Sequence, residues 1–439
     1  MNTVKLNLLK KIYVGILLVI FGGIVLHAPV SVISGVLFPG YTLIIKSWKE
    51  ILMLIAGSIA LVLILKNKQQ KILRDPIVVI IMIYAALHLL LVILFGGNIA
   101  AVAAGLAIDL RYLFFFVLVY VVLKIHPSYG KLFIKVGLAG AFVVIMFALL
   151  QIFILPYNAL EYIGYSKYSI LPYLLVDNNY HFIRINSTLR GPNPLGAYIG
   201  VVLSVLVAFI VKNKVKYKRQ LLPILLLFIG GLVTLWISYS RSALIGAIIA
   251  VAVVLSVVFI KKISKKCLLG ILIAVMALFG GLFIFRHTYF VTNILLHDNP
   301  NSLSVSNSNE QHTDSLIDGF GQLIEQPIGA GVGSTGSASI IGGQSEIIEN
   351  QYLFIAHESG WIGLGLFLII FIKIMYKLWQ RRSDWLSLGV FAGGIGLALI
   401  GLLLPVWVDD TVSIIWWGLA AVALLYSGKD YNGKNKRIY

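Results

Sequence analysis

Twelve apolar runs, each long enough to cross a lipid bilayer, restrict the possible folds of this 439-residue chain more than any other feature. A transmembrane helix needs about 20 mainly apolar residues, and a helix satisfies its own backbone hydrogen bonds in hydrocarbon. The mean hydropathy is +0.96, and 12% of the residues are charged, against about 25% in soluble domains. The sequence therefore predicts an all-α polytopic integral membrane protein with about twelve transmembrane helices. The runs lie near 12–28, 49–65, 77–95, 108–123, 136–155, 193–211, 221–238, 243–260, 268–285, 351–372, 386–405 and 413–427.

The placement of the basic residues explains the net charge of +18 without a nucleic-acid partner. If the N-terminus lies in the cytoplasm, twelve spans place the C-terminus there as well. In this arrangement 27 of the 35 Lys and Arg residues lie on the cytoplasmic side, together with only three of the 17 acidic residues. Basic residues concentrate in cytoplasmic loops, where they also contact anionic lipids. We therefore expect a multi-pass protein with both termini, including the basic tail 428–439, in the cytoplasm.

One long polar segment, 287–350, is expected on the extracytoplasmic side. It contains seven carboxylates and no Lys or Arg, so it cannot cross a bilayer, and we expect the chemistry there. The stretch 313–327 predicts a short amphipathic helix that ends at Pro327. The following GAGVGSTGS matches a dinucleotide-binding fingerprint only formally, because no βαβ unit surrounds it. It is either a flexible loop or a turn where backbone passes close to a glycan or a phosphate.

Basic residues on the expected outer side are the strongest pointers to a ligand. Arg241 stands in a very short turn between two spans, and Arg190 precedes another span in RGPNPLGAY. Each is either a snorkelling interfacial residue or part of an anion site, because a guanidinium holds phosphate oxygens through several donors. RGPNPLGAY is likewise either a well-formed helix start or an anion-binding helix N-terminus. The eight outer basic residues are Lys46, Lys49, Arg111, Lys167, Arg184, Arg190, Arg241 and Arg286.

Three charged residues in or beside spans should have specific partners. Asp109 and Arg111 are two residues apart and do not face each other on a helix, so separate partners are expected. Glu358 lies inside the tenth span, and a carboxylate at membrane depth has either a function or a partner. The histidines are scattered without ligand spacing, so the sequence predicts no metal site and no cofactor.

Four motifs, in order, resemble the O-antigen ligase and polymerase superfamily. They are RINSTLRGPNPLGAY, SYSRSA, HTDSLIDGFGQLIEQPIGAGVGSTG and ENQYLFIAHESGWIGLGLF. Each motif is degenerate, but their order around one long outer loop is fairly specific. The resemblance implies a multispanning glycosyltransferase in the bacterial cytoplasmic membrane. Such an enzyme acts outside on glycans carried by undecaprenyl pyrophosphate, with flippase and chain-length regulator proteins as possible partners.

The resemblance also implies roles for particular residues. Arg190 and Arg241 match basic positions that hold the pyrophosphate, with Arg111 and Arg184 as further candidates. His312 falls where members often carry Arg. Lipid A ligases carry a catalytic His in a pattern H-N-x-x-L, and here Glu349 takes that position. We expect Glu349 to act as a general base, or else only to cap the tenth span. Candidate residues for binding the glycan or acceptor are His312, Asn350 and Tyr352.

The departure at Glu349 argues against ligation to lipid A and favours a polymerase of capsule, exopolysaccharide or teichuronic-type chains. A flippase or exporter of lipid-linked oligosaccharide is the alternative, and it should carry charged residues deep in several spans. A structural membrane scaffold would leave the outer arginines unexplained. The expected division of the chain is 1–180 for the first five spans, 181–427 for the catalytic region and 428–439 for the tail.

Overall fold

The computed structural model describes residues 3–176, 178–213, 218–259, 284–285, 287–289, 291–292, 317, 319–321, 323–343 and 346–426. Within these residues the protein is mostly helical, and eight helices are long and apolar enough to span a membrane. Eleven of the twelve predicted ranges fall on helices. The ninth, 268–285, lies outside the described residues except for its last two positions, and so does the stretch 293–316 of the polar segment 287–350. The total of twelve spans therefore stays a prediction.

In the part of the chain that the structure describes, three shorter apolar helices accompany the eight long spans. The first, Val4–Leu37, joins α1 (Thr3–Gly23) to α2 (His27–Leu37) through the 3₁₀ turn η1 (Ile24–Leu26). One further span, Pro127–Phe153, joins η4 (Pro127–Tyr129) to α7 (Gly130–Phe153). The other six are α4 (Trp48–Lys66), α5 (Pro76–Phe95), α6 (Ile99–Ile125), α8 (Pro192–Asn213), α10 (Arg241–Phe259) and α14 (Gln351–Gln380). The shorter apolar helices are Leu222–Ile237 within α9 (Lys218–Ile237), α15 (Trp385–Ile400) and α16 (Asp410–Leu425). Small elements are α3 (Thr42–Lys46), α13 (Gly336–Ile341), η2 (Pro39–Tyr41), η3 (Gln70–Arg74) and η5 (Ala159–Ile163).

Side-chain caps fix where several helices begin. Asp75, Asn98, Asn350, Asp384 and Asp409 each stand just before a helix and accept hydrogen bonds from backbone N–H groups of its first turn. The first N–H groups of a helix have no partner within the helix, so a short polar side chain at this position stabilises the start. These caps set the ends of the apolar segments and therefore the positions of the charged residues beside them.

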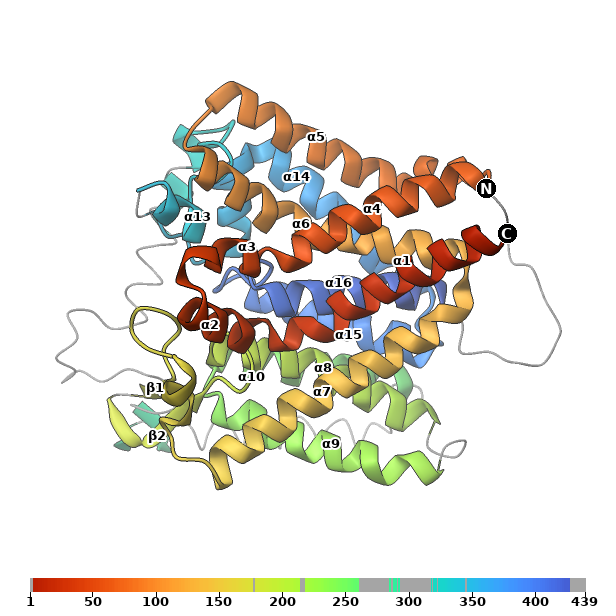
Figure 1. The fold of residues 1–439 in the computed structure, drawn as a ribbon. Helices are drawn as coiled ribbons and strands as arrows, with labels where there is room; N and C mark the ends of the chain where they lie inside the picture. Colours follow the sequence, from red (N-terminus) through yellow and green to blue (C-terminus); the bar gives the residue numbers. More distant parts are fainter. Residues whose placement is uncertain are drawn as a thin grey trace.

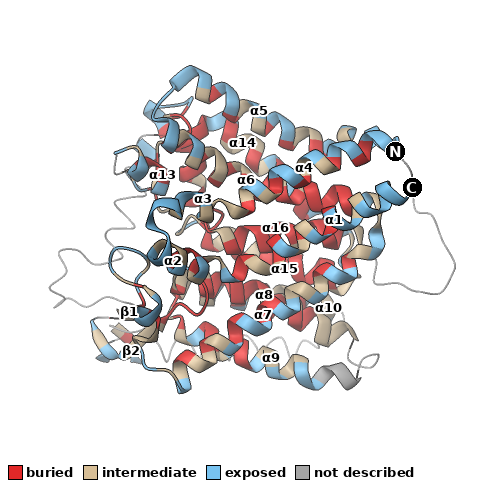
Figure 2. Cartoon of the chain, in the orientation of Figure 1, coloured by how far each residue is buried: buried red, intermediate tan, exposed pale blue. Residues whose placement is uncertain are grey.

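Small residues let the helices in the middle of the bundle approach closely. A Cβ added to Gly246 of α10 would lie 2.9 Å from the backbone oxygen of Gly396 in α15. Small residues at such contacts allow two helix backbones to pack without side chains between them. Large aromatic residues fill another part of the interior, where Trp407, Trp416 and Trp417 are almost fully buried. Figure 2 shows that burial is concentrated in the centre of the bundle and exposure at its ends and outer helices.

The helix ends gather at two opposite ends of the bundle. The N- and C-termini lie at one end, and α2, α3, α13 and the strands β1 (Tyr173–Val176) and β2 (Asn179–Ile185) lie at the other (Figure 1). We call these the termini end and the hairpin end. Helices α4, α6 and α8 carry Lys66, Lys124 and Lys212 in their last turns, toward the termini end. The alternation of sides that the charge pattern predicts is thus reproduced in space. Which end faces the cytoplasm stays a prediction.

A small β-sheet at the hairpin end differs from the all-helical fold that the sequence predicts. β1 and β2 form a two-stranded antiparallel sheet in which Leu174 pairs with Arg184 and Leu175 with Ile183. The register shifts after Leu175, so the turn end of the hairpin is irregular.

We expect the hairpin end to face the outside of the cell. In a Cys267→Ser background, a Tyr162→Cys variant should react with a membrane-impermeant maleimide in intact cells, because Tyr162 is 82% exposed at this end. A Gln70→Cys variant, at an exposed turn of the termini end, should react only after the membrane is permeabilised. The reverse labelling pattern would place every candidate site residue in the cytoplasm and contradict the prediction.

Candidate functional site

A cavity of about 370 Å³ opens at the hairpin end, and seven charged residues are among those that line it. It lies between η1–α2, the start of α4, α6, the loop before α8 and the start of α16. Its basic side chains are Lys46, Lys49, Arg111 and Arg190, its acidic side chains are Glu50, Asp409 and Asp410, and His27 completes the set. Charges of both signs therefore meet in one pocket at the end where the sequence places the chemistry.

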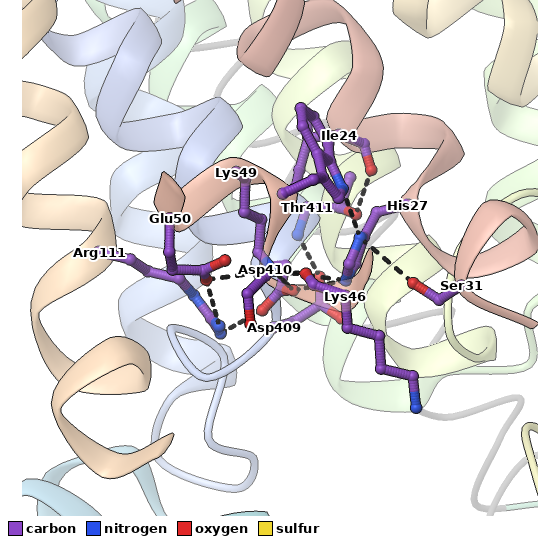
Figure 3. A network of polar contacts seen from close by, with 12 residues as sticks. Ile24, His27, Ser31, Lys46, Lys49, Glu50, Arg111, Asp409, Asp410 and Thr411 are labelled. Atoms are coloured by element: carbon purple, nitrogen blue, oxygen red, sulfur yellow. Dashed lines mark hydrogen bonds and ion pairs between the residues drawn. The ribbon is translucent and has the colours of Figure 1, made fainter. Parts of the chain in front are cut away.

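The carboxylate of Asp410 is the centre of an ion-pair network on the wall of this cavity (Figure 3). Its Oδ2 lies 2.9 Å from Lys49 Nζ and 3.0 Å from His27 Nε2, and its Oδ1 pairs with Arg111 Nη2. Lys49 and Arg111 are only 3% and 7% exposed. Removing charges from water is costly unless they are paired, so this carboxylate compensates two buried cations.

Neighbouring groups orient each member of this network. Trp48 Nε1 donates a hydrogen bond of 3.1 Å to His27 Nδ1, so Nε2 is the nitrogen left to carry the proton that His27 donates to Asp410. Arg111 also donates to the backbone oxygen of Val408 and lies 3.8 Å from Glu50 Oε1. Arg111 is therefore held by the protein itself.

Arg190 contributes differently from Arg111. It is exposed at the rim of the cavity, where its charge acts on Asp409. Asp409 is itself held by the start of α16, because its Oδ1 accepts hydrogen bonds of 3.0 Å from the backbone N–H groups of Thr411 and Val412. Arg190 thus faces the opening with its guanidinium accessible from outside.

Arg184 and Arg241 form a second basic cluster at the hairpin end. Arg184 Nε donates a hydrogen bond of 3.0 Å to the backbone oxygen of Ser238, and its Nη2 donates one of 2.7 Å to Asn193 Oδ1. Burial and the positive charge of Arg241 lower the pKa of the Arg184 guanidinium to about 10. Among the described residues, the charged neighbour that lowers the pKa of Arg184 is therefore another cation, Arg241. Two guanidinium groups held together in this way favour a bound anion.

The candidate acceptor residues lie at the start of α14. Asn350 caps this helix through Oδ1, which accepts from the backbone N–H groups of Tyr352 and Leu353, and its Nδ2 donates to the backbone oxygen of Leu402. Tyr352 donates its hydroxyl proton to the backbone oxygen of Ala398, 2.9 Å away. Glu349 is half-buried directly before this cap. The capping role considered for Glu349 is therefore taken by Asn350. His312 lies outside the described residues.

Glu358 and the Gly-rich segment are partners. Glu358 is 1% exposed, and its Oε1 accepts a hydrogen bond of 3.3 Å from the backbone N–H of Thr335. It lies near Asp109, whose Oδ2 is 3.5 Å from His88 Nε2. Asp109 and Arg111 thus have separate partners, as the sequence predicts.

The segment 327–336 packs against a break in α14. Gly360 has a φ of 65°, and the backbone N–H of Trp361 donates to the oxygen of Pro327 at 3.1 Å. Backbone groups freed at membrane depth need such protein partners. On the other side, a Cβ added to Gly333 would lie 2.4 Å from the backbone oxygen of Ala101 in α6. The glycines therefore serve close packing between α6 and α14, and Ser337, just beyond them, lines the cavity.

Sequence analysis did not single out His27, Lys49 or Asp410 as site residues. Lys49 and Asp410 carried a weak signal, since both are charged residues beside a span on the side expected to be poor in cations. His27 carried none. Within the described part of the chain, no three His, Cys, Asp or Glu side chains are grouped as metal ligands would be.

The network predicts unequal effects of two adjacent carboxylates on stability. Asp410→Asn leaves Lys49 and Arg111 without a full counter-charge and should reduce the free energy of unfolding by roughly 3–5 kcal/mol. Asp409→Asn keeps a capping oxygen for α16 and should cost less than about 1 kcal/mol. Unfolding of the purified variants in detergent, followed by tryptophan fluorescence, measures both. Equal losses would mean that the cap, and not the ion pairs, carries the stability.

Comparison with known proteins gives one match that agrees with this geometry. Residues 224–368 match a family model described as O-antigen ligase. The matched segment begins within α9 and ends within α14. No curated protein matches the chain. The matched region contains Arg241, Glu349 and the Gly-rich segment that packs on Glu358. The match supports a ligase- or polymerase-type function in a membrane and implies a lipid-linked oligosaccharide substrate. Residues 224–368 are thus similar to the O-antigen ligase family, and this match supports the O-antigen ligase-like superfamily.

Proposed function

We propose that this protein is a glycosyltransferase that polymerises or transfers undecaprenyl-pyrophosphate-linked oligosaccharide on the outer face of the bacterial cytoplasmic membrane, in the synthesis of capsule, exopolysaccharide or O-antigen-type chains. The family match supports the class of reaction and the lipid-linked substrate. The charge pattern, with 27 of 35 basic residues on the side of the termini, supports an outward-facing hairpin end.

The observation that carries the proposal is the pair of arginines at the hairpin end. Arg184 is held in place by Ser238 and Asn193, and burial together with the neighbouring charge of Arg241 lowers the pKa of its guanidinium. A pyrophosphate bound there would offset the repulsion between the two cations and receive several charge-assisted hydrogen bonds. The same contacts would stabilise the charge that develops on the pyrophosphate as it leaves.

The proposed reaction needs no nucleotide or metal cofactor, because the glycosyl–pyrophosphate bond of the donor supplies the free energy. A hydroxyl oxygen of the acceptor sugar attacks the anomeric carbon of the donor and forms the new glycosidic bond. The bond between that carbon and the pyrophosphate oxygen breaks, and undecaprenyl pyrophosphate leaves. Glu349, half-buried before α14, takes the hydroxyl proton. Asn350 and Tyr352 position Glu349 by fixing the start of the helix.

The second basic cluster favours polymerisation. A polymerase binds two lipid-linked substrates, and each of them carries a pyrophosphate. Arg190 and Lys46 line the opening of the charged cavity, while Arg111 and Lys49 are paired with Asp410 in its wall. We propose that Arg184 and Arg241 bind the donor pyrophosphate and that the cavity, through Arg190, receives the phosphates of the acceptor lipid. His312 stays a candidate for binding the glycan.

A flippase or exporter is the alternative, and one observation favours it. His88, Asp109 and Glu358 lie in three different helices and form a buried polar cluster at membrane depth. Transporters use such clusters in proton or ion coupling. Glu358, however, is bonded to the backbone of the segment that packs against α14, which gives the cluster a structural role. We therefore retain the enzyme as the better-supported function.

Two substitutions should separate donor binding from turnover. Arg241→Ala should abolish polymer formation and weaken donor binding, and Arg241→Lys should restore only part of both, because an ammonium lacks the planar fork. Glu349→Gln should reduce turnover by about 10²–10⁴-fold and leave donor binding unchanged. Product formation by purified protein and binding of the radiolabelled lipid-linked donor measure the two effects.

Lys167→Ala serves as the matched control, because Lys167 is an exposed cation at the same end that packs over the ring of Tyr168. This variant should behave as the unaltered protein. Normal turnover in both Arg241→Ala and Glu349→Gln would overturn the proposed site.

A further inference from the structure

Aromatic side chains form two groups at the hairpin end, on elements that also carry the arginine pair. We call the two groups together the aromatic track, and it consists of Tyr157, Tyr173, Tyr180, Phe182, Tyr239 and Tyr289. Tyr180 and Phe182 precede Arg184 in β2 by four and two residues. Tyr239 precedes Arg241 by two residues in the turn between α9 and α10.

Ring contacts hold each of the two groups together. Tyr157 contacts Tyr173 and Tyr180, with centroid separations of 5.1 and 5.9 Å, and both pairs are edge-to-face. Phe182 contacts Tyr239 at 6.2 Å and Tyr289 at 6.5 Å. In the two pairs of Tyr157, edge-to-face packing leaves the face of one ring open to another partner. The track is therefore a preformed surface whose side chains need little ordering on binding.

The exposure of the track argues against a role in the core. Tyr157, Tyr180 and Tyr289 are 48%, 60% and 48% exposed. Tyrosine is also common in the belts that anchor proteins at a membrane surface. Here the rings lie among polar groups, since Asn179 Nδ2 donates a hydrogen bond of 2.9 Å to the Tyr289 hydroxyl and His181 is exposed on the same strand. Open ring faces beside amide and imidazole groups suit a ligand that has both C–H faces and hydroxyl groups.

Sugars are ligands of this kind. One face of a pyranose ring presents C–H bonds that pack against an aromatic ring, and its hydroxyl groups form hydrogen bonds at the edge. The first sugar of a lipid-linked donor is bonded directly to the pyrophosphate, so it must lie next to the groups that hold this anion. From Arg184 to Tyr180 the strand extends ~13 Å, at about 3.3 Å per residue. This length accommodates a short oligosaccharide.

We propose that the aromatic track binds the glycan of the lipid-linked donor, with its first sugars on Phe182 and Tyr239 and the following sugars toward Tyr180 and Tyr157. This inference rests on the proposed function and adds to it a determinant of substrate length. The track contributes binding that is the same in the ground state and the transition state. Losing it should therefore raise the KM for the donor and leave kcat unchanged.

The test compares two donors in purified protein. One is undecaprenyl pyrophosphate carrying the complete repeat unit, extracted from the cells that make this protein. The other is undecaprenyl pyrophosphate carrying the first sugar alone. For the complete donor, the Tyr157→Leu/Tyr180→Leu variant should raise the KM about tenfold with kcat within twofold of the unaltered protein. For the single-sugar donor, which does not reach these two rings, both constants should be unchanged.

Two controls make the result specific. Tyr168→Leu removes a tyrosine that is 88% exposed at the same end but lies outside the track, and it should leave the KM unchanged. Tyr157→Phe/Tyr180→Phe keeps the rings and should keep most of the affinity, which shows that the hairpin is intact.

An unchanged KM for the complete donor in the leucine variant would overturn the inference. An equal rise in KM for both donors would also overturn it, because the rings would then act on the lipid or on membrane anchoring. If the unaltered protein transfers sugar from neither donor, the proposed function fails and this inference fails with it.

Discussion

The compensation of buried positive charge by Asp410 is the interaction on which the hairpin end depends. This one carboxylate pairs with Lys49 of α4 and Arg111 of α6 and accepts a hydrogen bond from His27 at the start of α2. It stands at the first position of α16, where the positive end of the helix dipole also favours an anion. Four elements that are distant in the sequence are thus joined at one point. The cavity keeps its shape because its wall is built from these paired charges.

A second constraint is the break in α14 at Gly360. The broken helix exposes backbone groups at membrane depth, and the segment 327–336 satisfies them while Glu358 holds that segment through Thr335. This arrangement fixes the part of the polar segment that leads to Glu349 and the start of α14. The catalytic candidate therefore follows a rigid support, and the arginines lie on other elements, with Arg184 in β2, Arg190 just before α8 and Arg241 at the start of α10.

Local sequence signals predict most of the fold, and contacts between distant segments explain what the sequence does not reveal. Apolar length located eleven of the helices, and Asp75, Asn98 and Asp384 cap helices as short polar residues do. The spacing of Asp109 and Arg111 was enough to predict separate partners, which the structure confirms. The identity of those partners was not predictable, because it depends on how α4, α5 and α16 pack around α6. The short hairpin also escaped prediction, since its strands lie in a loop with weak apolar alternation. Among the site residues, the sequence treated the arginines as one group, whereas the structure separates Arg111 and Arg190 from Arg184 and Arg241.

The proposed function requires that a new glycosidic bond forms while the bond between the donor sugar and its pyrophosphate breaks. One measurement tests this directly. Purified protein in liposomes, supplied with the undecaprenyl-pyrophosphate-linked repeat unit and no nucleotide, should form glycosidic bonds. It should release one undecaprenyl pyrophosphate for each bond formed, counted by mass spectrometry of lipid and glycan from the same sample. Movement of the intact lipid-linked oligosaccharide across the bilayer, with no new bond and no released undecaprenyl pyrophosphate, would contradict the account and identify a transporter.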